Sequence, residues 1–181
     1  VSISTANSPL TIANSAAESV AGNALTFSAG TSSVTVQDSA FDIGSGTLKL
    51  VGNSVSATGG AGSISGSGGS VAIEPASAGV AVRIGSGTAA TLTVSQGTID
   101  AVGPSIASIV IGRADGTATT SVGNATFGNN VTIQQGGTGG ALVVDVGLAD
   151  EIDQQRNADC DRASEGDLAA QGEMRDINGR R

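Results

Sequence analysis

The sequence predicts an all-β fold: a right-handed parallel β-solenoid (β-helix) followed by a flexible or partly helical acidic C-terminal tail. Three features of the 181 residues favour this fold class. Short segments alternate β-branched with small polar residues, large side chains are scarce, and a glycine-containing motif recurs. Together these features indicate short strands wound into stacked coils around a narrow interior.

The strand prediction rests on an alternation with a period of two residues. In segments such as Val34–Gln37, apolar residues alternate with Ser, Thr or Gln, so that one face of the strand is apolar and the other polar. Gly, Ser, Asn and Asp between the segments mark turns. No segment before residue 150 shows an amphipathic helical period. Examples of the predicted strands are Val1–Ser4, Leu25–Ser28, Val34–Gln37, Leu48–Val51, Val71–Glu74, Val80–Ile84, Leu92–Ser95, Ile109–Ile111 and Val131–Gln134.

The composition indicates a thin molecule. The chain holds 28 Gly and three Phe but no Trp or Tyr, although 39 % of its residues are hydrophobic. Such side chains cannot fill a thick core at native packing density. A coil filled by Val, Ile, Leu and Ala needs less volume and is favoured over a β-sandwich or an ordinary barrel, which remain the alternatives.

Internal similarity supports the solenoid. Ile43–Thr47 recurs identically 41 residues later as Ile84–Thr88, and a looser copy spans Ile111–Thr117. In the continuations of two copies, the pair Val94 and Ile99 matches Val122 and Phe127 in spacing. The unequal intervals of 41 and 27 residues predict loops of varying length between coils.

Charge divides the chain into two parts. Residues 1–149, the predicted β-solenoid body, carry seven acidic and three basic residues, whereas residues 150–181 carry nine acidic and five basic ones. The boundary falls near Gly147–Asp150. We expect the tail to be disordered, with a short helix around Glu165–Arg175 as the alternative, and its Cys160 to be an exposed thiol.

The composition also excludes several chemistries. Without His there is no Ser–His–Asp triad, and a single Cys gives neither an internal disulfide nor a redox pair. The acidic balance and the lack of stacking aromatics argue against a nucleic-acid partner. No apolar run is long enough for a membrane helix, and no basic n-region precedes an apolar stretch. We therefore expect no cofactor and no metal site.

Four charged residues are the best candidates for catalysis: Arg83, Asp100, Arg113 and Asp115. A polysaccharide lyase or hydrolase on this fold needs such groups gathered on one face. In the repeat alignment, however, Arg83 precedes its Ile-Gly pair, Arg113 follows its own, and Asp100 aligns with Gly128. Asp115, in Ala-Asp-Gly, has the context of a solvated turn. We therefore predict no catalytic residue.

The repeat unit Ile-Gly-x-Gly-Thr-x-(Leu)-Thr-Val-x-x-Gly-x-Ile, clearest over residues 43–55 and 82–134, resembles the repeats of bacterial autotransporter passengers and filamentous-haemagglutinin-type exoproteins. The resemblance implies a large secreted right-handed β-helix that acts as an adhesin and virulence factor at the cell surface or outer membrane. It is a likeness of repeat style, and no functional residue carries over.

These observations lead to a function expectation with two alternatives. We expect a non-enzymatic, extracellular or cell-surface structural or adhesive segment of bacterial type, which binds a host or cell-surface glycan or protein through its Ser/Thr-rich surface. The alternatives are a fragment of a polysaccharide-active β-helix enzyme and a trimeric phage or viral fibre segment. Open coil ends predict self-association as well.

Overall fold

The fold is known from a computed structural model, which describes residues 1–13, 18–19, 22–37 and 40–145. The described residues belong to one unit, Val1–Asp145. The predicted tail at 150–181, with Cys160 and the candidate helix, lies outside them. The described part is all-β, as predicted, with a single five-residue helix.

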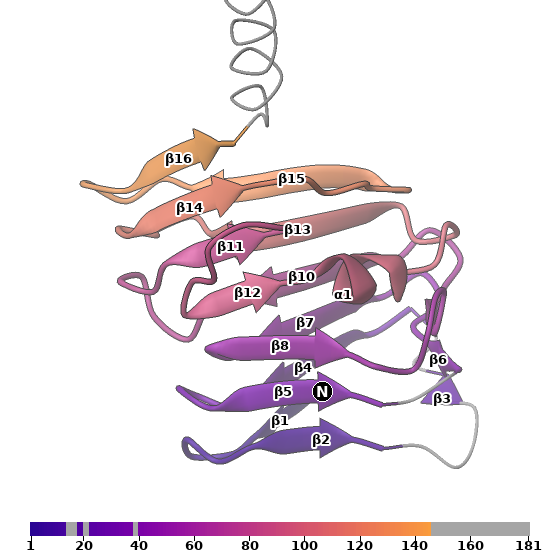
Figure 1. Ribbon diagram of the computed structural model, residues 1–181. Helices are drawn as coiled ribbons and strands as arrows, with labels where there is room; N and C mark the ends of the chain where they lie inside the picture. The colour runs from indigo at the N-terminus through magenta and orange to yellow at the C-terminus, as the bar shows by residue number, and fades with distance from the viewer. Residues whose placement is uncertain (14–17, 20–21, 38–39, 146–181) are drawn as a thin grey trace, which may run out of the picture. The chain divides into compact units, whose positions relative to one another are not determined.

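Sixteen strands and one helix follow one another in the described part of the chain (Figure 1). They are β1 (Ser2–Ser4), β2 (Leu10–Ile12), β3 (Glu18–Ser19), β4 (Ala24–Ser28), β5 (Ser33–Val36), β6 (Phe41–Asp42), β7 (Thr47–Val51), β8 (Ser54–Ala57), β9 (Ile64–Ser65), β10 (Ser70–Glu74), β11 (Val82–Ile84), β12 (Leu92–Val94), α1 (Gln96–Asp100), β13 (Ser108–Arg113), β14 (Thr119–Val122), β15 (Asn130–Gln135) and β16 (Ala141–Val144). Each of the nine predicted strands is present, with ends shifted by at most two residues.

The strands form four parallel sheets that wind as a β-solenoid of about six turns. Sheet A has the order β1-β4-β7-β10-β13-β15, sheet B has β2-β5-β8, sheet C has β3-β6-β9, and sheet D has β12-β11-β14-β16. The chain passes from sheet A to sheet B or D, then to the corner occupied by sheet C, and rises in a right-handed sense to the next turn (Figure 1). The predicted parallel solenoid is therefore confirmed.

The core is a set of aliphatic ladders, one side chain per coil. In sheet A the register aligns Ile3, Phe27, Leu50, Ile73, Ile111 and Ile133. The four residues of this ladder from Phe27 to Ile111 are buried, because alternate residues of each strand point inward. Two of the three Phe residues add the bulkiest contact: the rings of Phe27 and Phe41 lie 6.3 Å apart at 58°. Aliphatic side chains thus fill a thin interior, as the composition predicted.

The coil period is regular except in the fourth turn. Register partners lie 24 residues apart from β1 to β4, 23 from β4 to β7, 23 from β7 to β10, 38 from β10 to β13, and 22 from β13 to β15. On the face formed by sheets B and D, the long turn contributes two strands, β11 and β12, whereas every other turn contributes one. They are parallel neighbours, with Val82 opposite Leu92, so the chain must cross back over itself between them.

The identical pentapeptides do not mark this period, so that part of the sequence alignment was wrong. Ile43–Thr47 joins β6 to β7 at a corner of the solenoid, whereas Ile84–Thr88 leaves β11 for the crossover to β12. The two copies agree at their first glycine, since Gly44 and Gly85 both have positive φ, at 58° and 75°. They differ at the second, because Gly87 has φ at 116° and Gly46 has no positive φ.

The second repeat match was correct. Val94 and Val122 both align with Ile84, on either side of β11. Five residues further on, Ile99 is buried and Phe127 packs against the core. The predicted strand Leu92–Ser95 differs from β12 only at its last residue. Ser95 instead caps the single turn of α1, where its side chain accepts from the Thr98 amide. One turn is too short to show a helical period in the sequence.

Candidate functional site

Hydroxyl-bearing side chains form a row on the outward face of sheet B and a shorter one on that of sheet A. In sheet B, the register aligns Thr11, Thr35 and Ser56, and the Ser56 hydroxyl lies 3.4 Å from that of Thr35. In sheet A, the hydroxyls of Thr47 and Ser70 are 3.0 Å apart on adjacent coils. These rows arise because the residue types that alternate with the apolar ones are mostly Ser and Thr.

The outward faces carry little charge. The strands of sheet B contain no charged residue, and those of sheet A contain only Lys49, Glu74 and Arg113. Lys49 and Glu74 neutralise each other across adjacent strands, with Nζ and Oε2 at 2.8 Å. The exposed surface of these two sheets is therefore a polar but nearly neutral array, in which hydroxyl groups are the main hydrogen-bonding groups.

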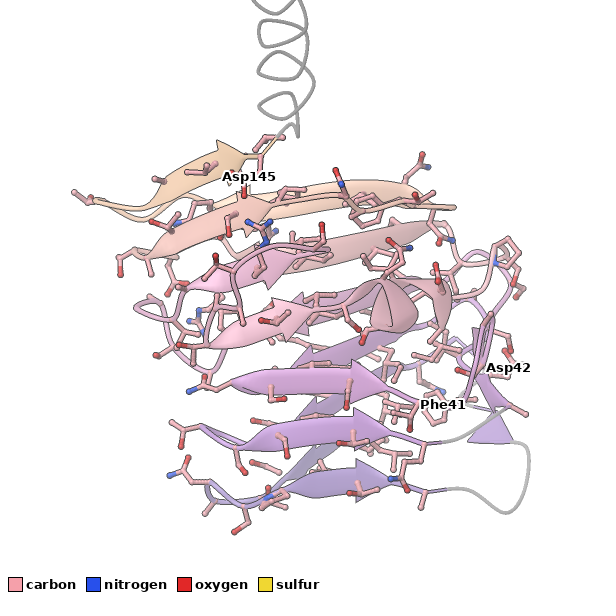
Figure 2. All side chains as sticks on the ribbon, in the orientation of Figure 1. Phe41, Asp42 and Asp145 are labelled. Atoms are coloured by element: carbon pink, nitrogen blue, oxygen red, sulfur yellow. The ribbon has the colours of Figure 1, made fainter. Side chains whose placement is uncertain are left out.

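Arg83 lies at the outward position of β11 yet is only 5 % exposed. Its Nε donates to the Ser86 carbonyl at 2.6 Å, and its Nη1 donates to Asp145 Oδ2 at 2.5 Å. Figure 2 shows Asp145 just beyond the end of β16. Arg83 thus ties the crossover loop after β11 to the last described residue, and its guanidinium is committed to these two partners.

Two glycines make room for the Arg83 side chain. A Cβ at Gly87 would overlap the guanidinium, and a Cβ at Gly123 would overlap both the guanidinium and the Ser86 carbonyl. Gly87 also has φ at 116°, which L side chains rarely adopt. The sequence does not reveal the role of Asp145, because Arg83 and Asp145 lie 62 residues apart along the chain.

Arg113 and Asp115 form a second, separate pair at the end of β13. Arg113 Nε donates to Asp115 Oδ1 at 2.8 Å, and Nη2 donates to Oδ2 at 3.0 Å. This fork lowers the pKa of the Asp115 carboxyl below its usual value and raises the pKa of Arg113. The Asp115 side chain is 64 % exposed, so the predicted solvated turn is confirmed.

Asp100 ends α1 and borders a small cavity of about 230 Å³, at the corner where sheet C has ended. The Gln96 side-chain amide donates to Asp100 Oδ1 at 2.7 Å. It also donates to the Thr126 carbonyl and accepts from the Thr126 backbone amide. Asn129, which also lines the cavity, donates to the Gly103 and Ile106 carbonyls. The cavity is lined by Ala61, Ile99, Asp100, Val102, Pro104, Gly128 and Asn129. Its polar groups hold α1 and the loop before β15 in place.

The four candidate residues are therefore held by different partners. Arg83 binds Ser86 and Asp145, Asp100 binds Gln96, and Arg113 binds Asp115. The structure brings together only Arg113 and Asp115, which were already close in sequence. Paired in this way on separate elements, these groups do not form the single charged cluster that lyase or hydrolase chemistry needs.

The described part of the chain shows neither a metal-ligand cluster nor a membrane-spanning helix. Within it, no three His, Cys, Asp or Glu side chains gather as metal ligands would. Its one helix falls far short of the length and apolar content required to cross a bilayer. The described part of the chain is a parallel β-solenoid, and the outward faces of its sheets A and B carry few charges and many hydroxyl groups. Comparison with family models, with curated proteins and with solved structures finds no match to this chain.

Proposed function

We propose that this chain is a non-enzymatic structural or adhesive β-solenoid segment of bacterial type. It would work outside the cell or at the cell surface, in association with the outer membrane. The observation that carries the proposal is the outward face of sheet B, where Thr11, Thr35 and Ser56 form an uncharged hydroxyl row over three coils. A shorter hydroxyl row lies on sheet A.

Binding would come from repetition of weak contacts. A hydroxyl both donates and accepts a hydrogen bond, so it pairs with sugar hydroxyls and with peptide groups alike. Each exposed contact contributes little, but contacts at a fixed spacing act together once the first is made. A neutral glycan or a protein surface fits this array better than a polyanion, which would need unpaired cations.

A glycan array tests the proposal directly. The labelled 181-residue chain should bind neutral glycans, and Thr35→Glu/Ser56→Glu should reduce that binding at least tenfold by placing two charges on the row. The matched control, Ser67→Glu/Thr126→Glu, adds the same charge at exposed positions off both sheets and should bind as the original chain does. Equal loss in both variants, or no binding by the original chain, would refute the proposal.

The enzyme and fibre alternatives have their own readouts. Release of unsaturated or reducing sugar from pectin- or alginate-like polymers, abolished by Asp100→Asn, would replace the adhesive proposal with a polysaccharide-active enzyme. Asp100 is the candidate for this test because it is exposed and borders a cavity. A discrete trimer in sedimentation velocity would favour the fibre segment.

A further inference from the structure

The cavity beside α1 lies where the corner of the solenoid changes its structure (Figure 1). In the first three turns this corner holds the two-residue strands of sheet C, whereas the fourth turn contributes α1 and a single bridge from Val102 to Ile64. A helix is about 10 Å wide with its side chains, against ~4.8 Å between strands, so neighbouring coils cannot pack evenly against it. The cavity walls come from three successive turns, which contribute Ala61, the segment at the end of α1, and Gly128 with Asn129.

Hydrogen bonds between these turns hold the walls in place. Gly62 N donates to the Asp100 carbonyl at 2.9 Å. The Gln96 side chain joins Asp100 Oδ1 to the backbone of Thr126 in the next turn. Asn129 Nδ2 donates to two backbone carbonyls of the loop after α1. The cavity is therefore preformed, and a ligand that enters it has few protein groups to order.

Two side-chain oxygens of the cavity have no partner among the described residues. Gln96 occupies only Oδ1 of Asp100, which leaves Oδ2 free. Asn129 turns its Nδ2 toward two carbonyls, which can only accept, so its Oδ1 is left without a donor. This Oδ1 is open to solvent, because within the described chain only Ser63 Oγ is both sealed and unpaired. The other lining residues have no polar side chain, so the lining side chains offer acceptors and no unused donor.

No basic side chain of the described residues neutralises Asp100. The basic residues there are Lys49, Arg83 and Arg113, and each forms an ion pair with a different acidic residue. The side chain of Asp100 instead binds the uncharged amide of Gln96. A cationic ligand would therefore supply the charge that the protein itself does not place beside this carboxylate.

We propose that this cavity binds a small primary alkylammonium ion. An ammonium group has three donors and no acceptor, which suits Asp100 Oδ2 and Asn129 Oδ1. Its alkyl chain would lie against Ile99, Val102 and Pro104. The cavity volume of about 230 Å³ exceeds the ~150 Å³ that holds benzene and is below the ~300–1,000 Å³ of sites for drug-sized ligands. The site lies off the hydroxyl rows of sheets A and B and does not rest on the adhesive proposal.

An NMR titration of the whole chain tests the site. n-Butylammonium chloride should shift the backbone amide signals of Gly128 and Asn129 saturably, with a dissociation constant in the millimolar range expected of so small a ligand. n-Butanol, which has the same chain without the charge, should bind at least tenfold more weakly, and sodium chloride at equal ionic strength should leave the signals in place. Nα-acetyl-lysine methylamide distinguishes two sources of the ammonium group. Binding as tight as that of n-butylammonium supports a lysine side chain of a partner, and binding tenfold weaker supports a free amine.

Two pairs of variants test the charge and the space separately. Asp100→Asn keeps the acceptor for Gln96 but removes the charge, and should weaken binding at least tenfold. Its control, Asp42→Asn, removes a carboxylate on β6 outside the cavity (Figure 2) and should bind as the original chain does. Gly128→Leu should also weaken binding at least tenfold, because a Cβ there meets nothing within 4 Å and the larger side chain can fill the cavity. Its control is Gly79→Leu, at another open position.

Circular dichroism checks that every variant keeps its β content. The proposal would be overturned by the absence of saturable shifts in the original chain, by equal binding of n-butanol, or by undiminished binding in Asp100→Asn or Gly128→Leu. Loss of binding in a variant and its control alike would overturn it too. Asp100→Asn should still bind neutral glycans if the adhesive proposal holds, so the two proposals fail separately.

Discussion

The Arg83 guanidinium occupies space that two glycines leave open. The sequence shows an arginine in a strand and several glycines in turns, but it does not show that Gly87 and Gly123 border the same side chain. That relation depends on the crossover after β11, which places Ser86 and Asp145 within reach of one guanidinium. Sequence reasoning treated Arg83 as a candidate catalytic cation, whereas its contacts are those of a structural tie.

Substituting Gly123 tests this tie. Gly123→Ala should lower the free energy of unfolding by about 1–3 kcal/mol, because the added methyl overlaps the guanidinium and the Ser86 carbonyl. In Gly79→Ala, nothing lies within 4 Å of the added Cβ, so stability should change little or rise slightly. Urea denaturation followed by circular dichroism measures both. Equal stability of the two variants would contradict the steric account.

The ion pair of Arg113 and Asp115 has a consequence for acid titration. The pKa of Asp115 is lowered from 3.8, mainly by the hydrogen bond from Arg113. Because the pKa is lowered in the folded state, the Asp115 carboxyl there binds its proton at a lower pH than it does in the unfolded state. The pair's contribution to stability is therefore present above pH 3.8 and is lost as pH falls through the lower folded value.

Carbon-13 NMR of the Asp115 carboxyl should show a midpoint below 3.8. In Arg113→Gln the midpoint should move back up towards that value, because the charged donor is gone. Lys49→Gln, which breaks a different ion pair, is the control and should leave the Asp115 midpoint in place. An unchanged midpoint in Arg113→Gln would mean that another group lowers the Asp115 pKa.

At the scale of elements, the fourth turn shows what periodicity can and cannot predict. Alternation located nine of the sixteen described strands, among them all those of five or six residues: β4, β7, β10, β13 and β15. It did not locate β2, β8, β14 and β16, which have three or four residues, nor β3, β6 and β9, whose two residues cannot show a period. It also gave no sign that β11 and β12 share one turn, because a crossover is a relation between strands and not a property of either one.

The extra strand leaves a break between sheets B and D. β8 is the last strand of sheet B, and β12, the first of sheet D, lies next to it without a ladder between them (Figure 1). Leu92 N donates to Ala81 O at 3.1 Å, and Gly85 N donates to Val94 O at 2.9 Å, so Leu92 and Val94 face β11. The backbone of Thr93, between them, must then face β8.

Hydrogen exchange should reveal this break. We expect the Thr93 amide to exchange at least tenfold faster than the Val94 amide, although both belong to one three-residue strand. Val110 is the control for a mid-strand residue of the unbroken sheet A, where β13 has neighbours on both sides, and should be protected as well as Val94. NMR after transfer to deuterated buffer measures all three. Equal protection of Thr93 and Val94 would indicate a continuous sheet across β8 and β12.

At the scale of the whole molecule, stability should depend on position along the stack. Each coil contacts mainly the coils above and below it. Truncating a side chain in an interior coil should therefore lower the free energy of unfolding more than the same truncation in a coil at the end of the described stack. Composition alone predicted the thin aliphatic interior. It did not predict which coil would be interior, because the order of coils depends on strand register.

Two truncations in the same ladder test this dependence. Leu50→Ala, at a 1 % exposed position, should cost about 2–5 kcal/mol of unfolding free energy. Ile3→Ala, at a 45 % exposed position in the first coil, should cost less than about half of that. Both are measured by urea denaturation at a concentration where the chain is monomeric. Equal losses would indicate that the first coil is packed as tightly as the third.

The direction of the ladders has a mechanical consequence. The hydrogen bonds between coils run along the axis of the stack, so a pull along that axis loads one ladder at a time and peels the coils apart from an end. A pull along the strands would instead shear every bond of a ladder together. The Arg83 side chain spans β14 to reach Asp145, and so acts as a strap over the last two coils. Under axial tension, the opposite end, where β1 and β2 lack such a strap within the described residues, should open first.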